Sequence, residues 1–500
     1  MQPILSVEAM RNSDFETIRS GVSSKDLMWR AGEGIFSSYP WHGKVAIVCG
    51  SGNNAGDGYV LALLMQKNAI PCTLVLLSDR FSEDGRYYFD RCVACGIEYV
   101  QYSANFNFSP YTEIVDCILG TGFSGTVTGV YRDAIERINC SNKIVISADI
   151  NSGLNGNNGC TELCVRSDLT VSIGYFQYGH FLGNAKDCMK EKKNISIGID
   201  LYGDAAYLPE KSDFLPVLKK RLQNSHKGTY GYVLLMGGCT EYAGAIKLAS
   251  MSCAALRSGC GVATLAVPKS IVHAVTPYLL ESTIVGLEDE NGHVLPNPEA
   301  LDRVFSKKAA IAVGMGWGSN VGNVAILSHL LRNYETNVVI DADGLNTLSQ
   351  MDPTILKETK CHVLLTPHPM EFSRLSGNSV DAILHDPIGL SMQYARENRV
   401  CVLLKGPCTV VTDGTETLLV DRGCAGMATA GSGDVLSGIL AGLLGYAPLT
   451  PLTVACGAYI AGLAGELAEK SENEISMLAS DTVKHISKAI SNIIKSEEEV

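Results

Sequence analysis

The chain has 500 residues, which is too long for one ordinary hydrophobic core and long enough for two or three domains. Apolar residues make up 46% of it and charged residues 18%, a composition that excludes an intrinsically disordered chain. The net charge of -12 disfavours nucleic acid as the main partner, because a phosphate backbone is bound through a basic surface.

The 17 cysteines are scattered without a repeated spacing, and free thiols in this number suit a reducing cytosol. The single Cys-x-x-Cys pair, Cys92 and Cys95, has no second pair to complete a zinc site, so two ordinary thiols are expected. The N-terminus lacks a basic segment followed by an apolar run, so no secretory signal is expected. The sequence therefore predicts a cytoplasmic protein.

The first half of the chain alternates apolar runs with stretches long enough for helices. Continuous apolar strands separated by helices indicate a parallel sheet covered on both faces, with ligands at the carboxyl ends of the strands. Candidate ligand-binding residues do follow these runs, among them Asp149 and Ser152. The predicted strands are 45–49, 72–77, 113–119, 143–148 and 169–173.

A polar stretch from 211 to 225 predicts a linker or first helix between a domain at 1–210 and a second domain at 226–495. A second alternating series begins there, again with glycine-rich or polar residues directly after the apolar runs. Its predicted strands are 231–236, 261–267, 309–313, 337–340, 362–365 and 400–404.

Residues 435–465 carry no charge, which raises the question of a membrane span. Pro448 and Pro451 interrupt the run, and glycine is frequent in it. Two buried helices joined by a turn explain this segment better, so no membrane partner is expected.

The loop Gly50-Ser-Gly-Asn-Asn-Ala-Gly-Asp-Gly58 lies between a predicted strand and a helix expected to begin near Tyr59. Its glycines allow the backbone to approach a phosphate or sugar closely. The loop is neither the dinucleotide fingerprint nor a P-loop, and a Gly/Asn/Asp loop alone is more often a tight turn, although its two asparagines and one aspartate favour a ligand. Asp149 has a comparable alternative, an Asx-turn or helix cap. Three such loops at the ends of neighbouring strands favour a ligand site.

The loop Gly423-Cys-Ala-Gly-Met-Ala-Thr-Ala-Gly-Ser-Gly-Asp434 precedes an apolar helix, whose amino end would stabilise a phosphate or oxyanion. Asp434 there is a candidate general base, with a simple helix cap as the alternative. Lys405 follows a predicted strand and fits either a phosphate contact or a solvated strand end. His368 lies between two prolines on a rigid loop, and its alternatives are ligand contact and a structural role.

The strings Gly52-Asn-Asn-Ala-Gly-Asp-Gly58, Asp116-x-x-x-Gly-Thr-Gly-Phe-Ser-Gly125 and Asp149-Ile-Asn-Ser-Gly153 resemble the NAD(P)H-hydrate epimerase family, the YjeF N-terminal domain. The family's usual forms have glycine where this chain has Ala55 and proline where it has Asn151. The resemblance implies that Asn54, Asp116 and Ser152 hold a potassium ion, and that Asp149 is the acid/base group. It further implies that the hydrated cofactor is bound by Asn53, Asn54, Ala55, Gly56, Asp57, Gly120, Thr121, Gly122, Phe123, Ser124, Gly125 and Thr126.

The block from His226 to about Ala447 resembles the ADP/ATP-dependent NAD(P)H-hydrate dehydratase family, of ribokinase-like fold. The matching strings include Asp341-Ala-Asp-Gly-Leu-Asn346, Thr366-Pro-His-Pro-x-Glu371 and the loop that ends at Asp434. The resemblance implies that the adenine nucleotide is contacted by Lys405, Gly406, Pro407, Cys408, Thr409 and Gly433, and the hydrated cofactor by Ala245, Gly316, His368 and Asp434. The expected fold is α/β, with two three-layer αβα domains of mainly parallel sheets, Rossmann-like and then ribokinase-like.

Together the two resemblances imply a bifunctional repair enzyme for NADHX and NADPHX, the hydrates of NADH and NADPH. The first domain would interconvert the epimers, and the second would dehydrate the S epimer with ADP, or ATP, and Mg²⁺. Two alternatives remain open: a small-molecule kinase in the second domain, and a non-catalytic binding module in the first. The preferred nucleotide, the preferred hydrate and any coupling between the sites also stay open, and a homo-oligomer is expected by family analogy.

Overall fold

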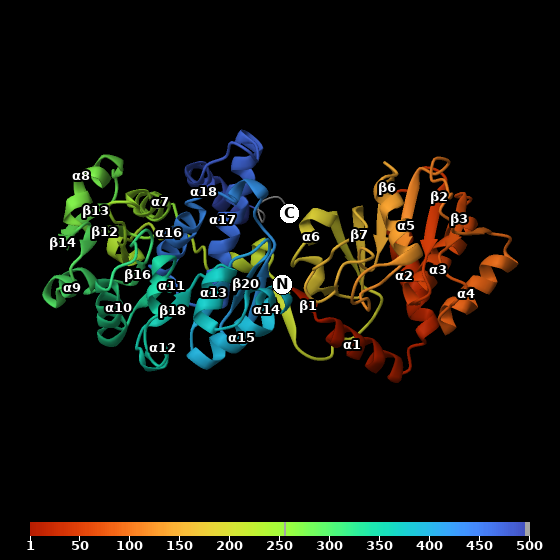
Figure 1. The fold of residues 1–500 in the computed structure, drawn as a ribbon, viewed down its shortest axis with the longest axis horizontal. Coiled ribbons are helices and arrows are strands. Elements are labelled where there is room, and N and C mark those ends of the chain that lie inside the picture. The colour runs from red at the N-terminus through yellow and green to blue at the C-terminus, as the bar shows by residue number, and fades with distance from the viewer. Residues whose placement is uncertain (255–256, 496–500) are drawn as a thin grey trace. The chain divides into compact units, whose positions relative to one another are not determined.

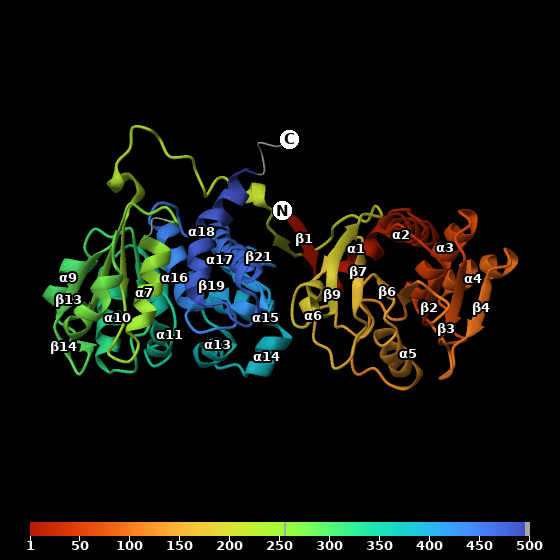
Figure 2. The ribbon, with the colours of Figure 1, turned by 90° about the horizontal axis from the view of Figure 1, so that it is seen from above.

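The computed structural model describes residues 1–254 and 257–495, with side chains omitted for 252–254. It divides into two compact units, drawn from two directions in Figures 1 and 2. The N-terminal unit holds Pro3–Ala206, and the C-terminal unit holds Met1–Gln2 with Tyr207–Val500. The fold is α/β with large, mainly parallel sheets, which confirms the expected class.

The N-terminal unit contains a seven-stranded sheet in which every neighbouring pair is parallel. All five predicted strands are present, and two edge strands were missed because they are short and exposed or rich in charge. In order across the sheet, the strands are β4 (Glu98–Gln101), β3 (Cys72–Leu76), β2 (Val45–Cys49), β5 (Glu113–Cys117), β6 (Ile144–Ala148), β7 (Ser167–Ile173) and β9 (Met189–Ile195).

Side chains of β2 alternate between two hydrophobic cores, as a sheet covered on both faces requires. Val45 and Ile47 pack into the core beneath α2 and α3, while Ala46 and Val48 pack into the core beneath α5. Figure 2 shows α2 and α3 on one side of the strands and α5 on the other. The helices are α1 (Val7–Arg19), α2 (Ser24–Ser38), α3 (Asn53–Lys67), α4 (Glu83–Ala94), α5 (Gly129–Asn139) and α6 (Ala185–Cys188), and a short β1 (Gln2–Leu5) pairs with β8 (Phe176–Gln177).

Helix α3 begins at Asn53 and not near Tyr59, which corrects the prediction from the sequence. Gly52 is its N-cap residue, in extended conformation, so the chain turns into the helix directly after the second loop glycine. The loop is therefore short, and the polar residues that follow it form the first turns of the helix.

In the C-terminal unit, the first seven strands across the sheet run parallel to one another, and the next two pair in antiparallel fashion. All six predicted strands are present within one residue at each end. The sheet order is β13 (Thr283–Leu287), β12 (Val262–Pro268), β11 (Tyr232–Met236), β16 (Ala310–Val313), β17 (Asn337–Ile340), β18 (His362–Leu365), β19 (Cys401–Leu404), β20 (Thr409–Thr412) and β21 (Thr417–Val420), after which Leu418 pairs with Tyr207 of β10 (Ala205–Leu208).

The main core of this unit lies under α7, α16, α17 and α18, which pack on one another (Figure 1). The longer helices are α7 (Ala243–Ala254), α9 (Pro298–Phe305), α10 (Gly322–Asn333), α13 (Pro369–Ser376), α15 (Pro387–Asn398), α16 (Ser432–Leu444), α17 (Pro451–Glu472) and α18 (Ala479–Ile494). The shorter ones are α8 (Val272–Val275), α11 (Asp343–Leu348), α12 (Ile355–Glu358) and α14 (Val380–His385), beside a hairpin of β14 (Asp289–Glu290) and β15 (His293–Val294).

The uncharged segment that starts at residue 435 forms two helices joined by a turn, as predicted. By length and composition alone, α17 could cross a membrane, but 83% of its apolar window is buried within the structure. Such burial is typical of a core helix. The 211–225 stretch contains a 3₁₀ turn, Lys211–Phe214, whose Phe214 is fully buried in the main core.

Candidate active sites

A cavity of about 520 Å³ opens at the carboxyl ends of β2, β5 and β6 in the N-terminal unit. Eight of the predicted binding residues line it: Asn53, Asn54, Asp57, Gly120, Thr121, Gly122, Phe123 and Asp149. The other predicted contacts, Ala55, Gly56, Ser124, Gly125 and Thr126, lie outside its lining. Ala55 and Gly56 lie on the packed side of α3, where a Cβ at Gly56 would meet Met28. The strand-end loops are thus gathered around one cavity, as the parallel sheet requires.

Asp149 directly follows β6 and has a φ of 62°, a conformation that costs a non-glycine residue about 1–3 kcal/mol. Its Oδ2 accepts a hydrogen bond from the Thr121 backbone N–H at 2.9 Å. Its backbone carbonyl accepts one from Nε2 of the fully buried His180 at 2.8 Å. Burial lowers the pKa of His180 to about 4, so the ring is neutral at pH 7. Thr121 therefore holds the Asp149 carboxylate, and His180 holds its backbone.

The Nε2 of His180 is the protonated nitrogen, because its Nδ1 accepts the backbone N–H of Gln177 at 3.1 Å. The sequence prediction missed His180. The signal for it was weak, since a single histidine after a two-residue strand has no recognisable spacing to the loop it supports.

Behind the cavity, the carboxylate of Asp116 is fully buried and has no cationic partner among the described residues. It accepts hydrogen bonds from the Ser147 hydroxyl and the Ser152 backbone N–H, each at 2.9 Å. Burial raises the pKa of Asp116, and these hydrogen bonds counteract part of the rise.

Asn54, in the first turn of α3, leaves one buried acceptor unused. Its Nδ2 donates to the Ala148 carbonyl at 3.3 Å, but its buried Oδ1 accepts no hydrogen bond from any described residue. A buried acceptor without a partner costs about 1–3 kcal/mol. An oxygen-ligated cation would satisfy that atom, so the donor set fits the predicted potassium ion.

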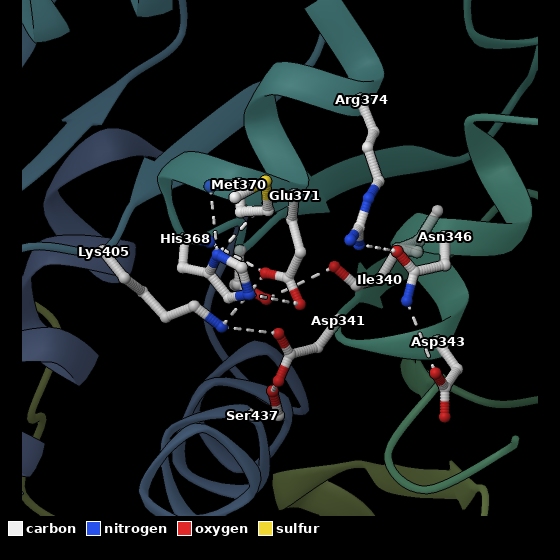
Figure 3. Close-up of polar contacts among 11 residues, drawn as sticks. Ile340, Asp341, Asp343, Asn346, His368, Met370, Glu371, Arg374, Lys405 and Ser437 are labelled. Carbon is white, nitrogen blue, oxygen red and sulfur yellow. Dashed lines mark hydrogen bonds and ion pairs between the residues drawn. The ribbon is translucent and has the colours of Figure 1, made fainter. Parts of the chain in front are cut away.

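In the C-terminal unit, an ion pair at the carboxyl edge of the sheet joins Asp341, after β17, to Lys405, after β19 (Figure 3). Lys405 Nζ lies 2.9 Å from Asp341 Oδ1 and 3.7 Å from Glu371 Oε2. Ser437 of α16 donates its hydroxyl to Asp341 Oδ2 at 2.7 Å. Burial acts to raise the pKa of Asp341, but the Lys405 charge and these hydrogen bonds outweigh it, and the pKa is lowered.

The predicted residue set missed Asp341, Glu371 and Ser437. A signal for the two carboxylates was present, since both occur in polar strings that directly follow predicted strands. Ser437 lies inside an apolar helix, and nothing in its local sequence distinguishes it from an ordinary buried serine.

Asp434 is the third residue of α16 and does not cap the helix, because the N-cap residue is Gly431 with a φ of 95°. Among the described residues its carboxyl makes no hydrogen bond or ion pair. Burial, followed by the charge of Asp341, raises its pKa to about 7, while Lys405 opposes the rise. A carboxyl poised near neutral pH without a partner is suited to proton transfer.

Gly433 places the loop backbone beside the ion pair, since a Cβ there would lie 3.6 Å from both Asp341 Oδ2 and Lys405 Nζ. Gly316, with a φ of 65°, packs so tightly that a Cβ would lie 2.9 Å from the Cβ of Ala245. The side chain of Cys408 is 3% exposed, so this predicted nucleotide contact offers only its backbone to a ligand.

His368 has a structural role that the sequence left open: it is the N-cap of α13. Its Nδ1 accepts the backbone N–H groups of Met370 and Glu371 at 3.1 and 3.3 Å. Burial, together with the nearby Lys405 charge, lowers its pKa, so the ring is neutral at pH 7. Its Nε2 lies 3.4 Å from Glu371 Oε1, and contact with a ligand stays a prediction.

Breaking the Asp341–Lys405 pair is expected to destabilise the C-terminal unit, because the Asp341 side chain is only 2% exposed and its loss would leave the Lys405 charge without this partner. Asp341→Asn should lower the free energy of unfolding of that unit by about 3 kcal/mol, the low end for breaking a buried pair. Urea unfolding at pH 7 measures this. Glu288→Gln, which breaks an exposed pair with Lys269, should cost far less; equal losses would contradict a structural role for the buried pair.

Two α/β units, each with an acidic group and close-approaching backbone at the carboxyl edge of its sheet, define a fused two-site α/β enzyme. Residues 24–179 match the family described as YjeF-related protein N-terminus, and residues 233–488 match NAD(P)H-hydrate dehydratase. The chain belongs to the family of bifunctional NAD(P)H-hydrate repair enzymes.

Relatives match along nearly the whole chain. The bifunctional NAD(P)H-hydrate repair enzyme of Thermofilum pendens is 32% identical over 94% of this chain and 92% of its own, and that of Moorella thermoacetica is 32% identical over 95% and 93%. The enzyme of Escherichia coli is 30% identical over 92% and 88%. A ribokinase-like superfamily protein from Enterococcus faecalis, 24% identical, covers 59% of this chain and 98% of its own with a TM-score of 0.51, which shows the fold of the C-terminal unit.

Proposed function

We propose that this chain repairs hydrated nicotinamide nucleotides, with the N-terminal unit interconverting the R and S epimers of NAD(P)HX and the C-terminal unit dehydrating the S epimer with ADP or ATP. Membership in the repair-enzyme family supports the pair of activities. The observation that carries the proposal is that each unit holds a half-buried aspartate at the carboxyl edge of its sheet. This residue is Asp149 in the N-terminal unit and Asp434 in the C-terminal unit.

In the dehydratase unit, hydroxide is a poor leaving group and phosphate a good one. Asp434 takes the proton of the substrate hydroxyl as its oxygen attacks the terminal phosphoryl group of the nucleotide, and the shortened nucleotide departs. The lone pair of the ring nitrogen then expels the new phosphate and forms a C=N bond, and the loss of a proton from the adjacent ring carbon to water re-forms the carbon–carbon double bond. Lys405 and the amide of Gly433 lie beside Asp341, where they neutralise charge that develops on the phosphate.

The C-terminal site also fits a Mg²⁺ ion carried by the nucleotide. Burial is the main cause of the raised pKa of Asp434, and the negative charges of Asp341 and Asp343 raise it further. These negative charges would stabilise a bound cation. Mg²⁺ is usually held by one or two carboxylates together with substrate phosphates. Bound there, it would neutralise phosphate charge during transfer.

In the epimerase unit, we assign the potassium site to Asn54, Asp116 and Ser152, on the strength of the unused Asn54 Oδ1 and the uncompensated Asp116 carboxylate. Bound there, potassium would supply a positive charge to the cavity. Asp149, whose carboxylate accepts the Thr121 N–H, acts as the base. It accepts a proton either from the hydroxyl group on the hydrated carbon or from the water that adds to this carbon.

The remaining assignments follow the family pattern. The adenine nucleotide contacts Lys405–Thr409 and Gly433, and the hydrated cofactor contacts Ala245, Gly316, His368 and Asp434. The protein acts in the cytoplasm as a homo-oligomer, without nucleic acid or membrane as a partner.

A mixed-epimer sample of NADHX tests the function directly. Purified protein with ADP, or with ATP, is expected to convert the whole sample to NADH, followed by absorbance at the NADH wavelength. No recovery with either nucleotide would overturn the proposal. Accumulation of a stable phosphorylated product would identify the C-terminal unit as a small-molecule kinase.

The dehydratase rate is expected to depend on pH through Asp434. Its pKa is raised to about 7, and a base must be deprotonated, so kcat/KM for (S)-NADHX should rise as the pH rises through about 7 and level off above it. Rates measured from pH 5.5 to 9 at saturating nucleotide check this. A profile flat down to pH 5.5 would exclude Asp434 as the base.

A further inference from the structure

Asp57 is a second carboxyl group in the N-terminal cavity, and the family pattern gives it only a place in the binding loop. It lies in α3, is 9% exposed and lines the same cavity as Asp149. Among the described residues, its carboxyl takes part in no hydrogen bond or ion pair. A buried carboxyl that no protein group satisfies points to a ligand in the cavity.

The two carboxyl groups are brought together by the close approach of two loops. A Cβ added at Gly120 would lie 2.9 Å from Asp149 Oδ2 and 3.5 Å from the Cβ of Asn54. The Asp149 carboxylate therefore reaches the first turn of α3, and Asp57 follows Asn54 on the next turn of that helix. One small substrate in this cavity is able to meet both groups.

The environments of the two groups differ. Burial raises the pKa of Asp149 as well, but the Thr121 N–H that its carboxylate accepts counteracts part of that rise, whereas Asp57 has no donor among the described residues to stabilise a negative charge. Burial, followed by the charges of Asp149 and Asp14, raises the pKa of Asp57 well above its usual range. The titratable or charged groups around it are Arg11 and Asp14 of α1, Asp84 of α4 with its partner Lys25 of α2, Cys117 of β5 and Asp149.

Asp57 differs from Asp84 and Asp14, two other carboxyl groups of the cavity, in its ion pairing and its exposure to solvent. Asp84 is paired with Lys25 at 3.7 Å, and Asp14 is only half-buried on α1. Asp57 is thus the cavity carboxyl best shielded from solvent and from cations. Two carboxyl groups whose surroundings separate their protonation states form an acid and a base.

We propose that Asp57 is the catalytic acid of epimer exchange and works with Asp149 as the base. The proposal rests on the epimerase function assigned above to the N-terminal unit. It adds the residue that carries the proton needed by the departing hydroxyl group.

The carboxylic acid of Asp57 gives its proton to the hydroxyl on the carbon bonded to the ring nitrogen. The C–O bond breaks, water leaves, and the nitrogen lone pair forms a C=N bond. Water then adds to the other face, Asp149 accepts its proton, and the C=N electrons return to nitrogen. The enzyme ends with Asp149 protonated and Asp57 ionised, ready for the reverse exchange or for proton exchange with solvent.

Asp57→Asn, Asp57→Glu and wild type are compared in the full-length protein, with R and S NADHX separated by chromatography and no nucleotide present. Asp57→Asn should lower kcat for exchange at least about 100-fold, as for loss of a general acid, with KM within about threefold. The wild-type rate should fall at high pH as Asp57 ionises, and Asp57→Glu should keep that fall. The residual rate of Asp57→Asn should not fall at high pH. If Asp57 had only a structural role, the variant would keep this fall.

Asp90→Asn is the matched control, because Asp90 is exposed on α4 and, within the described part of the chain, forms an ion pair with Arg86 alone. It should leave exchange unchanged. A rate of Asp57→Asn within threefold of wild type, or an unchanged alkaline fall in that variant, would overturn the proposal. If wild type itself exchanges no epimers, the function assigned to the unit fails instead. Thermal unfolding checks folding, and Asp57→Asn should not lower the melting temperature at pH 8, since it removes a buried carboxyl that resists ionisation.

Discussion

Asp434→Asn is expected to lower NADH recovery from (S)-NADHX about 10²–10⁴-fold, the range for loss of a positioned general base. Asparagine keeps the shape of the side chain but cannot accept the hydroxyl proton, so phosphoryl transfer loses its base. The other groups at this edge, including the Lys405–Asp341 pair, stay in place. The measurement is the initial rate of NADH formation at saturating ADP and Mg²⁺.

The control for this variant is epimer exchange in the same preparation, which should be unaffected because the two sites lie in different units. The fold is not expected to suffer. Because the pKa of Asp434 is raised in the folded state to about 7, its contribution to stability is lost as the pH rises through that value. At pH 8 the melting temperature of Asp434→Asn should therefore equal or exceed that of wild type. A rate within tenfold of wild type would remove Asp434 from the mechanism.

Asp149→Asn is expected to give the opposite pattern. With ADP present, a mixture of epimers should yield NADH rapidly from the S portion and then stop, whereas wild type consumes the whole sample. The substitution keeps an oxygen that accepts the Thr121 N–H, so the turn after β6 is preserved while the base is lost. Exchange measured without nucleotide should fall about 10²–10⁴-fold.

Mixing the two variants provides the sharpest check of both assignments. Asp149→Asn supplies a working dehydratase and Asp434→Asn a working epimerase, so together they should recover all of the NADH. Failure of the mixture, with both proteins folded, would show that one substitution damages more than its own site. Complete consumption of a mixed sample by Asp149→Asn alone would remove Asp149 from epimer exchange.

Much of the fold could be predicted because buried parallel strands are continuous apolar runs. Strands such as 45–49 are legible for this reason, whereas β9, with its run of charged residues, gives no such signal. The start of α3 was misplaced because glycine and asparagine are typical of loops. Only the structure shows that Gly52 is the N-cap and that the helix begins at the next residue.

The sites were predictable to the extent that motifs mark strand ends. Asp149 and Asp434 follow from their loops, but the contact of Lys405 with Asp341 joins residues 64 positions apart, and no local pattern reports it. His180 is missed for the same reason, since its role depends on a carbonyl 31 residues away. Long-range contacts of this kind follow from the sheet order, which single motifs do not encode.

The apolar helix α17 has a consequence for how the protein is made. Its main neighbours in the fold, α16, α18, β20 and β21, are close to it along the chain, and the 3₁₀ turn Lys211–Phe214, which also packs on it, is synthesised earlier. A nascent chain can therefore cover this membrane-length segment with residues synthesised just before and just after it, without waiting for distant partners. Until α18 emerges from the ribosome, however, one side of the segment stays open to chaperones and to other nascent chains.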